Sequence, residues 1–168
     1  MVIVLMGVSG AGKTTVGTRL AEALGWDFAD ADDFHPEANV RTMERGEPLT
    51  DADREPWLRA LRDFIADRLA AGEPAVVTCS ALKASYRNTL LEGLDDADLV
   101  YLRGSYELVR RRLKARTDHF FDTELLESQF ETLEEPGPDE ALIVDIDAPP
   151  DALVRTIQRK LTGPPAPS

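Results

Sequence analysis

The sequence predicts an α/β protein: a five-stranded parallel sheet with helices on both faces and a helical lid. Three observations lead to this fold class. Short apolar runs recur along the chain, amphipathic segments separate them, and glycine-rich or polar segments follow several of the runs directly. Strands that alternate with helices in this way form parallel sheets covered on both faces. Ligands of such sheets bind beyond the carboxyl ends of the strands, so we expect functional residues just after each strand.

The first elements are clear from hydrophobic periodicity. Residues 2–6 are continuously apolar and β-branched, which is typical of a strand buried on both faces. Residues 13–24 carry apolar side chains every four positions and are followed by a glycine, as helices often are. Residues 27–30 are a weaker strand candidate. Residues 36–45 begin with a proline, which suits the first turn of a helix, and a glycine follows them.

The middle of the chain repeats the alternation. Asp53 is the predicted cap of a long helix whose apolar stripe ends before Gly72. Residues 75–79 and 98–102 are buried strand candidates, and a short helix over 85–91 connects them.

The last third predicts two helices, a strand and a final helix. The helices cover residues 105–115 and 123–133, and a proline-glycine-proline segment ends the second one. Residues 142–146 form the fifth strand, and Asp151 is expected to cap a helix that reaches Leu161.

The composition is that of one globular domain. The chain has 168 residues, of which 43% are hydrophobic and 30% charged. A chain of this length buries roughly two-thirds of its unfolded surface. Its net charge of −12 would repel nucleic acid. If the chain binds a small anion, its few basic residues must gather in one cleft. We expect residues 1–162 to form a single domain, residues 163–168 to be a flexible tail, and no nucleic acid to bind.

Cysteine usage and hydropathy bear on the location of the protein. The single cysteine, Cys79, excludes an internal disulfide and is interpreted as a small core residue. The apolar run over residues 2–6 is too short for a signal peptide, and no stretch reaches the roughly 18 apolar residues of a membrane span. We therefore expect a cytoplasmic protein that does not associate with membranes.

The segment between the first strand and the first helix matches a phosphate-binding loop. Residues 7–14 read Gly-Val-Ser-Gly-Ala-Gly-Lys-Thr, the pattern G-x-x-x-x-G-K-[ST] in its required strand–helix context. The backbone N–H groups of such a loop surround phosphates at the positive end of the helix dipole. Lys13 is expected to reach the β- and γ-phosphates, and the Thr14 hydroxyl to ligate Mg²⁺. The predicted nucleotide-binding residues are Gly7, Ser9, Gly10, Ala11, Gly12, Lys13, Thr14 and Thr15.

The loop alone leaves the reaction open, because kinases, GTPases and ATPases share it. The chain has no guanine-reading Asn-Lys-x-Asp motif, and it has no clear apolar strand followed by the aspartate of a hydrolytic metal site. Its small size leaves little room for effector modules. These points favour a kinase that acts on a small molecule.

Acidic residues follow the second strand, where a kinase needs a base for the acceptor hydroxyl. Asp32 is the predicted base, with Asp30 or Asp33 beside Mg²⁺ and water. The alternative is a solvated turn in an acid-rich protein. His35 alone is more typical of a capping or packing histidine.

Basic residues follow the third strand. Lys83 and Arg87 are four residues apart, so on a helix they would face the same way. Two cations suit an anionic acceptor such as a carboxylate, which arginine can bind through two hydrogen bonds. A solvated helix face explains the spacing equally well, and Arg54 is similarly ambiguous.

A closing lid is predicted over about residues 116–134. Arg112, Arg116 and His119 precede an aromatic pair and an amphipathic helix. Arginines in such a lid, Arg116 among them, are candidates to contact the transferring phosphoryl group, while closure excludes water. A charged helix–turn–helix without this role is the alternative.

These blocks together resemble the gluconokinase family of P-loop sugar-acid kinases. The resemblance covers about residues 2–148 and rests on the order of several motifs as much as on the phosphate loop. The further motifs are residues 30–36 (Asp-Ala-Asp-Asp-Phe-His-Pro), 46–51, 53–58, 79–83 with Tyr86-Arg87, 116–121 and 128–134. It implies ATP-dependent phosphorylation of D-gluconate at its 6-hydroxyl, with Mg²⁺, by a cytoplasmic homodimer.

The resemblance also implies roles for individual residues. Arg112 is expected at the nucleotide, and Arg116 at the reacting phosphate. The acceptor-binding residues implied by the resemblance are Asp32, His35, Arg54, Lys83, Arg87, His119 and Gln129. Ala31 departs from the glycine of many family members, which costs little unless the backbone there needs a positive φ.

Two other interpretations stay open at this point. A shikimate kinase would have a similar phosphate loop and first helix, but the segments around His35 and Lys83 do not supply its acceptor pattern. A nucleotide-sensing module would keep the fold without turnover, although intact Lys13, Thr14 and Asp32 argue against it.

Overall fold

A single parallel sheet forms the centre of the molecule. The structure, a computed structural model, describes residues 1–116 and 123–162, with Arg116 described by its backbone alone. All neighbouring strands pair in parallel, in the order β2-β3-β1-β4-β5. The strands are β1 (Val2–Met6), β2 (Asp27–Asp30), β3 (Ala75–Thr78), β4 (Ala97–Arg103) and β5 (Leu142–Asp145). The predicted five-stranded parallel sheet is confirmed.

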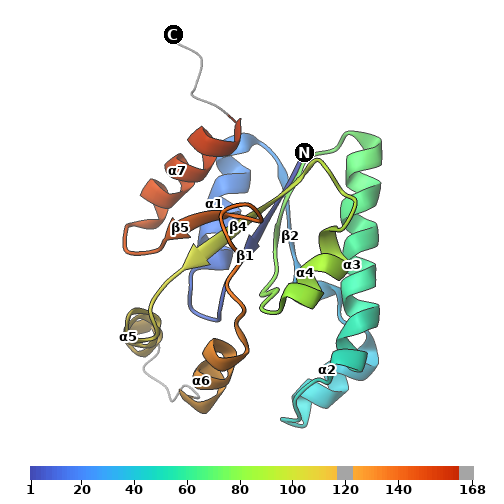
Figure 1. Ribbon diagram of the computed structural model, residues 1–168, viewed down its shortest axis with the longest axis vertical. Coiled ribbons are helices and arrows are strands. Elements are labelled where there is room, and N and C mark those ends of the chain that lie inside the picture. The colour runs from blue at the N-terminus through green and yellow to red at the C-terminus, as the bar shows by residue number, and fades with distance from the viewer. Residues whose placement is uncertain (117–122, 163–168) are drawn as a thin grey trace.

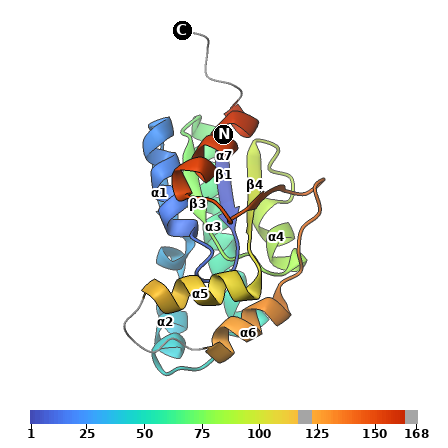
Figure 2. The ribbon, with the colours of Figure 1, turned by 90° about the vertical axis from the view of Figure 1, so that its left-hand side faces the viewer.

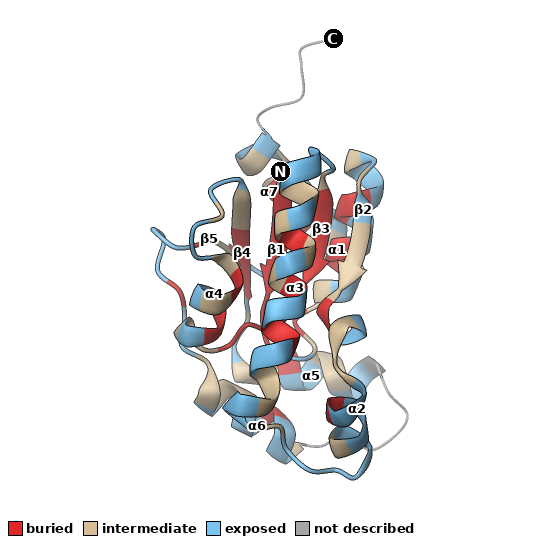
Figure 3. Cartoon of the chain, turned by 90° about the vertical axis from the view of Figure 1, so that its right-hand side faces the viewer, coloured by how far each residue is buried: buried red, intermediate tan, exposed pale blue. Residues whose placement is uncertain are grey.

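Helices cover both faces of this sheet, as predicted. The helices are α1 (Lys13–Leu24), η1 (a 3₁₀-helix, Ala31–Phe34), α2 (Glu37–Glu44), α3 (Asp51–Ala71), α4 (Ala84–Leu91), α5 (Tyr106–Arg116), α6 (Thr123–Thr132) and α7 (Pro150–Thr162). The helices α1 and α7 pack on one face, and α3 and α4 pack on the other (Figure 1). Figure 3 shows α3 lying across this face of the sheet, and its buried residues Trp57, Leu58, Leu61 and Ile65 belong to the hydrophobic cluster there.

The central position of β1 in the sheet explains why its sequence is apolar without interruption. All five of its residues are fully buried. Ile3 and Leu5 belong to the hydrophobic cluster under α1 and α7, whereas Val2, Val4 and Met6 belong to the cluster under α3. Each face of the strand therefore needs apolar side chains, and the alternation typical of a half-exposed strand is lost.

Two predicted helix caps are wrong by part of a turn. Thr50 is the N-cap of α3: its hydroxyl accepts from the N–H of Asp53, and the Asp53 carboxylate accepts from the N–H of Thr50. Asp53 is thus the third helical residue of a capping box. Asp151 lies inside the first turn of α7, where its negative charge complements the helix dipole. The N-cap of α3 therefore lies three residues before the predicted one, and α7 begins at Pro150, one residue before Asp151.

The short helix η1 was not predicted. Its formation follows from Asp30, whose side chain accepts a hydrogen bond from the N–H of Asp32 at 2.9 Å. Aspartate favours such local turns because its carboxylate can replace a backbone acceptor. The turn places Asp32 directly beyond the end of β2.

The helices α2, α5 and α6 lie beyond the carboxyl ends of the strands, at the edge where ligands of such sheets bind (Figure 2). The predicted lid corresponds in part to α6, while residues 117–122 lie outside the described residues. The predicted tail, residues 163–168, lies outside them as well. In the part of the chain that the structure describes, no helix is both long enough and apolar enough to cross a membrane.

The packing of α1 on the sheet depends on one small residue. A Cβ atom at Gly17 would lie 2.9 Å from both Phe28 Cε2 and Thr78 Cγ2. Gly17 lets α1 pack closely on the sheet, and this packing helps to position the first turn of the helix and the loop before it.

Replacing Gly17 with Val is expected to lower the free energy of unfolding by about 2 kcal/mol, because the added side chain overpacks the interface between helix and sheet. Ala23→Val, on the exposed face of the same helix, is the matched control and should cost less than about 1 kcal/mol. Urea unfolding measures both. Equal effects of the two substitutions would contradict the packing described for Gly17.

Candidate active site

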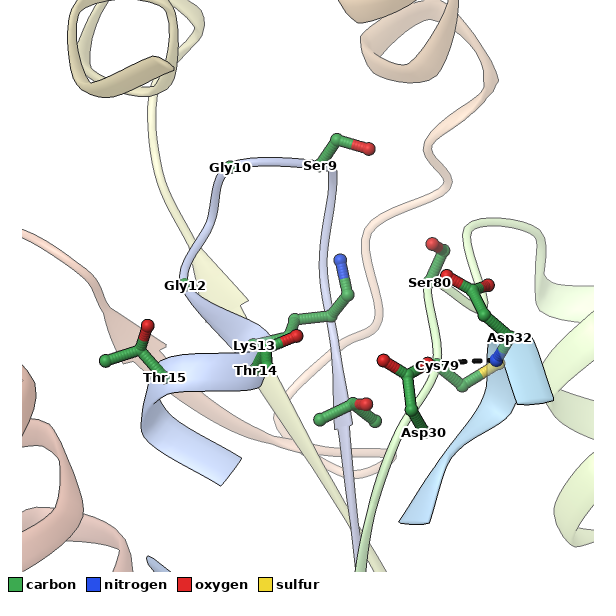
Figure 4. Close-up of a pocket in the computed structure, with 11 residues that line it drawn as sticks. Ser9, Gly10, Gly12, Lys13, Thr14, Thr15, Asp30, Asp32, Cys79 and Ser80 are labelled. Carbon is green, nitrogen blue, oxygen red and sulfur yellow. Dashed lines mark hydrogen bonds between the residues drawn. The ribbon is translucent and has the colours of Figure 1, made fainter. Parts of the chain in front are cut away.

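A polar pocket opens where β1, β2 and β3 end (Figure 4). Asp30 lines it from the end of β2, Asp32 from η1, and Ser80 from the segment after β3. Six of the predicted nucleotide-binding residues line it from the loop before α1: Ser9, Gly10, Gly12, Lys13, Thr14 and Thr15. The pocket therefore joins the predicted phosphate loop to the predicted catalytic aspartate.

The phosphate loop needs glycine at two of its positions. Gly10 has a φ of +83°, and a Cβ atom there would lie 2.6 Å from Leu113 Cγ of α5. Gly12, with a φ of +95°, is the N-cap of α1. The left-handed backbone turns the loop into the helix, whose first N–H groups have no partner within the helix. These groups are the donors that a phosphate would accept from.

Gly7 and Ala11 support the loop from below without lining this pocket. The N–H of Gly7 donates to the carbonyl of Ser80 at 3.3 Å, which ties the loop to the segment after β3. Ala11 is buried and lines a neighbouring pocket.

Lys13 lies along the inside of the loop (Figure 4). Its Nζ donates to the carbonyls of Gly7 and Val8 at 2.8 and 3.0 Å. Burial lowers the pKa of Lys13, while the negative groups around it, including Asp32 and Asp30, act in the opposite direction. An ammonium in this position holds the loop closed and can also face phosphate oxygens.

Asp32 has the properties of a poised base. Desolvation by the surrounding atoms, and after it the negative charge of Asp30, raise the pKa of Asp32, although most of its side chain is exposed to solvent. The positive charge of Lys13 opposes the rise. A raised pKa strengthens the carboxylate as a proton acceptor. Asp32 and Lys13 line the same pocket, so a base and a phosphate-facing cation can act on one pair of reactants.

His35 is held as a neutral ring beside this base. It stacks on Trp57 with ring centroids 4.2 Å apart, and its Nδ1 lies 3.4 Å from the amide nitrogen of Asn39. That nitrogen can only donate, so the ring proton lies on Nε2, which is 3.9 Å from an Asp32 oxygen. Burial lowers the pKa of His35 and favours the neutral form. Trp57 also donates to the carbonyl of Ala31 at 2.6 Å, so it supports both groups.

Four side chains form a network at the predicted acceptor side. The Tyr86 hydroxyl donates to Asp51 Oδ1 at 2.5 Å and accepts from Arg54 Nη1 at 3.1 Å. Lys83 Nζ lies 3.3 Å from the same carboxylate oxygen. The hydrogen bonds from Tyr86 and Lys83 lower the pKa of Asp51. Two donors thus converge on one carboxylate, and the Arg54 guanidinium lies 3.9 Å from it. The sequence singled out neither Asp51 nor Tyr86 as a site residue.

Arg87 does not face the same way as Lys83, contrary to prediction. Lys83 is the N-cap of α4 with an extended backbone, so the four-residue spacing of a helix does not apply to the pair. Arg87 is 4% exposed; its Nε pairs with Glu140 at 2.9 Å, and its Nη1 donates to the carbonyls of Ala81 and Leu82. It holds the loop that carries Lys83.

The lid residues are placed in part. Arg112 of α5 donates to the carbonyl of Ile146 at 2.6 Å and lines a second pocket on the far side of the phosphate loop. Gln129 of α6, predicted to contact the acceptor, is bonded to Ser9 of the phosphate loop. The Arg116 side chain and His119 lie outside the described residues.

Cys79 is buried beside the pocket, in agreement with its interpretation as a core residue. Burial raises the pKa of its thiol to about 12, so the reactive thiolate does not form near neutral pH.

Comparison with known proteins identifies the family. A family model described as an AAA domain matches residues 2–136. The thermoresistant gluconokinase of Escherichia coli (strain K12) is 46% identical over 155 residues, covering 91% of this chain and 89% of that protein. The chain belongs to the gluconokinase family. A gluconokinase of Gluconobacter oxydans (strain 621H) is likewise 47% identical over 158 residues, covering 94% of this chain and 89% of its own.

The gluconokinase fold extends over nearly the whole chain. The crystal structure of a gluconokinase from Sinorhizobium meliloti 1021 is similar with a TM-score of 0.83 and 46% identity, covering 95% of this chain and 90% of that one. The P-loop kinase fold and the family resemblance predicted from the motifs are both confirmed.

The pH dependence of this gluconokinase-family chain should reflect the raised pKa of Asp32. A base must be ionised, so kcat/KM is lost as the pH falls through that pKa. Asp30→Asn removes the neighbouring charge, lowers the pKa of Asp32 and should move the acidic limb of the kcat/KM profile to lower pH. Asp33→Asn, whose effect on Asp32 is weaker, is the control and should move the limb less. A limb that stays in place or moves to higher pH in Asp30→Asn would contradict the assignment of Asp32.

Proposed function

We propose that this chain transfers the γ-phosphoryl group of ATP to the 6-hydroxyl of D-gluconate. One observation carries the proposal: in a chain of the gluconokinase family, Lys13 of the phosphate loop and the poised carboxylate of Asp32 line one pocket. A phosphate donor and an acceptor hydroxyl that meet there would have a cation at the phosphate and a base at the hydroxyl.

The nucleotide would span the two neighbouring pockets. Its phosphates would accept from the N–H groups of the loop and of the first turn of α1, with Lys13 beside them. Gly10, Gly12 and Thr15 line both pockets, so the second pocket continues directly from the phosphate site. Its walls combine apolar residues with Arg112, which suits a nucleoside with a flat base and polar edges.

Mg²⁺ fits the donor atoms at this site. The Thr14 hydroxyl and the carboxylate of Asp30 line the same pocket, and hard oxygen donors are the ligands that Mg²⁺ prefers. The described residues contain no group of three or more His, Cys, Asp or Glu side chains able to hold a metal on their own. Thr14 would therefore share the ion with phosphate oxygens and water. Bound Mg²⁺ supplies positive charge to the phosphates.

The acceptor would be oriented by its two ends. Asp32 would accept the proton of the 6-hydroxyl as the hydroxyl oxygen attacks the γ-phosphorus of ATP, and ADP would leave. Lys83 and Tyr86, which donate to the carboxylate of Asp51, can donate to the carboxylate of gluconate in the same manner, and Arg54, which lies beside them, adds positive charge. A buried neutral His35 beside Asp32 can hydrogen-bond a sugar hydroxyl.

The proposal includes a cytoplasmic homodimer. A single, buried cysteine fits a reducing compartment. A shikimate kinase or a nucleotide-binding module without turnover is less well supported, since the chain shares 46–47% identity with named gluconokinases.

A coupled assay of ADP release with a panel of acceptors tests the function. Release should depend on gluconate and should be absent with shikimate or without an acceptor. Lys13→Met should lower kcat by at least about 10²-fold, because the transferring phosphate loses its fixed cation. Lys160→Met on α7, outside both pockets, is the control and should behave like the native chain. Release with shikimate, or without any acceptor, would contradict the proposal.

A further inference from the structure

The side chain of Gln129 grips the tip of the phosphate loop through two hydrogen bonds. Its Oε1 accepts from the backbone N–H of Ser9 at 2.7 Å, and its Nε2 donates to Ser9 Oγ at 2.9 Å. The backbone N–H can only donate, so the orientation of the Gln129 amide is fixed. Ser9 lies at the tip of the loop, above Lys13 (Figure 4). Two bonds between residues 120 positions apart therefore tie α6 to the loop.

These bonds engage Ser9 without using the donors at the start of α1. The N–H of Ser9 donates to Gln129, whereas the first N–H groups of α1 have no partner within the helix and stay available to a phosphate. The next residue, Gly10, packs against Leu113 of α5. The tip of the loop is thus held from the side of α5 and α6, which lie together beyond the sheet (Figure 2).

Five residues after Gln129, Glu134 makes a similar pair of hydrogen bonds to the loop that carries Lys83. Its N–H donates to the carbonyl of Leu82 at 2.8 Å, and its carboxylate accepts from the N–H of Ala84 at 2.9 Å. Lys83 is the N-cap of α4 and offers no side-chain cap of its own. Glu134 supplies that cap from outside the helix and so fixes the backbone on both sides of Lys83.

The segment between these two contacts is firmly packed. Leu126 is 2% exposed, and Phe130 meets the ring of Tyr106 edge-on at 5.5 Å. Leu133 touches the hydrophobic clusters of both faces of the sheet. The packed segment therefore holds each contact in place independently, so the loss of one leaves the other where it is.

We propose that Gln129 and Glu134 are positioning residues, one for the phosphate donor and one for the acceptor, on a single rigid segment. Gln129 sets the loop that receives ATP, and Glu134 sets the loop that presents Lys83 to the acceptor carboxylate. This inference rests on the proposed function. It differs from the role implied by family resemblance, in which Gln129 contacts the acceptor itself.

The first test is a double-mutant cycle on the donor side. Gln129→Leu should raise the KM for ATP and the Kd of ADP roughly fivefold to tenfold, with the KM for gluconate within about twofold of native, since both bonds to Ser9 are lost. Ser9→Ala removes one of the bonds and should have a smaller effect. The double variant should be no worse than Gln129→Leu alone, because the two residues act through one contact. Additive effects, or a rise confined to the KM for gluconate, would overturn the role of Gln129.

The second test addresses the acceptor side. Glu134→Ala should raise the KM for gluconate about tenfold and leave the Kd of ADP unchanged, whereas Glu134→Gln keeps an acceptor for the Ala84 N–H and should restore most of the affinity. A purely structural role of Glu134 predicts that both variants lose stability and that ADP affinity falls with them, which would overturn the inference.

Controls separate this inference from the proposed function. Ser128→Ala, on the exposed side of α6 beside Gln129, should leave every constant unchanged. Thermal unfolding confirms that each variant is folded before its constants are compared. Absence of gluconate-dependent turnover in the native chain refutes the proposed function, whereas native turnover with an unaltered Gln129→Leu variant refutes this inference alone.

Discussion

The parallel alignment of β1, β2 and β3 is the constraint on which the site depends. In the register of the sheet, Leu5 lies opposite Thr78, and Thr78 lies opposite Asp30, so the three strands end nearly level. Parallel strands leave their carboxyl ends at one edge, and the segments that follow them must therefore meet. The phosphate loop, the aspartate turn and the loop that carries Lys83 come from different parts of the chain, yet the sheet alone brings them to one pocket.

Several cations gather at that edge of the sheet, although the molecule as a whole is acidic. The chain carries a net charge of −12, but hydrogen bonds and ion pairs hold a few cations in place at the end of the sheet. Lys13 is held by carbonyls of its own loop, and Lys83 and Arg54 lie at the carboxylate of Asp51. Such preorganised cations attract charge where it develops in phosphoryl transfer.

Local sequence patterns predicted most of the fold, because the relevant forces act over a few residues. The apolar run over residues 2–6 is enough to predict β1, and the glycines at positions 12 and 25 mark the two ends of α1. The misplaced interactions are those set by tertiary structure. Helical spacing predicts that Arg87 and Lys83 face the same way, but Lys83 lies just outside the helix and Arg87 is buried. The contact of Gln129 with the phosphate loop crosses 120 residues and leaves no periodic signal.

The identity of the phosphorylated product tests the central claim most directly, since it reports donor, acceptor and position together. ³¹P NMR of the reaction of ATP with gluconate should show ADP and one new phosphomonoester. The claim predicts that this resonance is a triplet, because a phosphate on the 6-hydroxyl couples to the two protons of a CH₂ group. A doublet would place the phosphate on a secondary hydroxyl, and inorganic phosphate alone would mean hydrolysis; either result would contradict the claim.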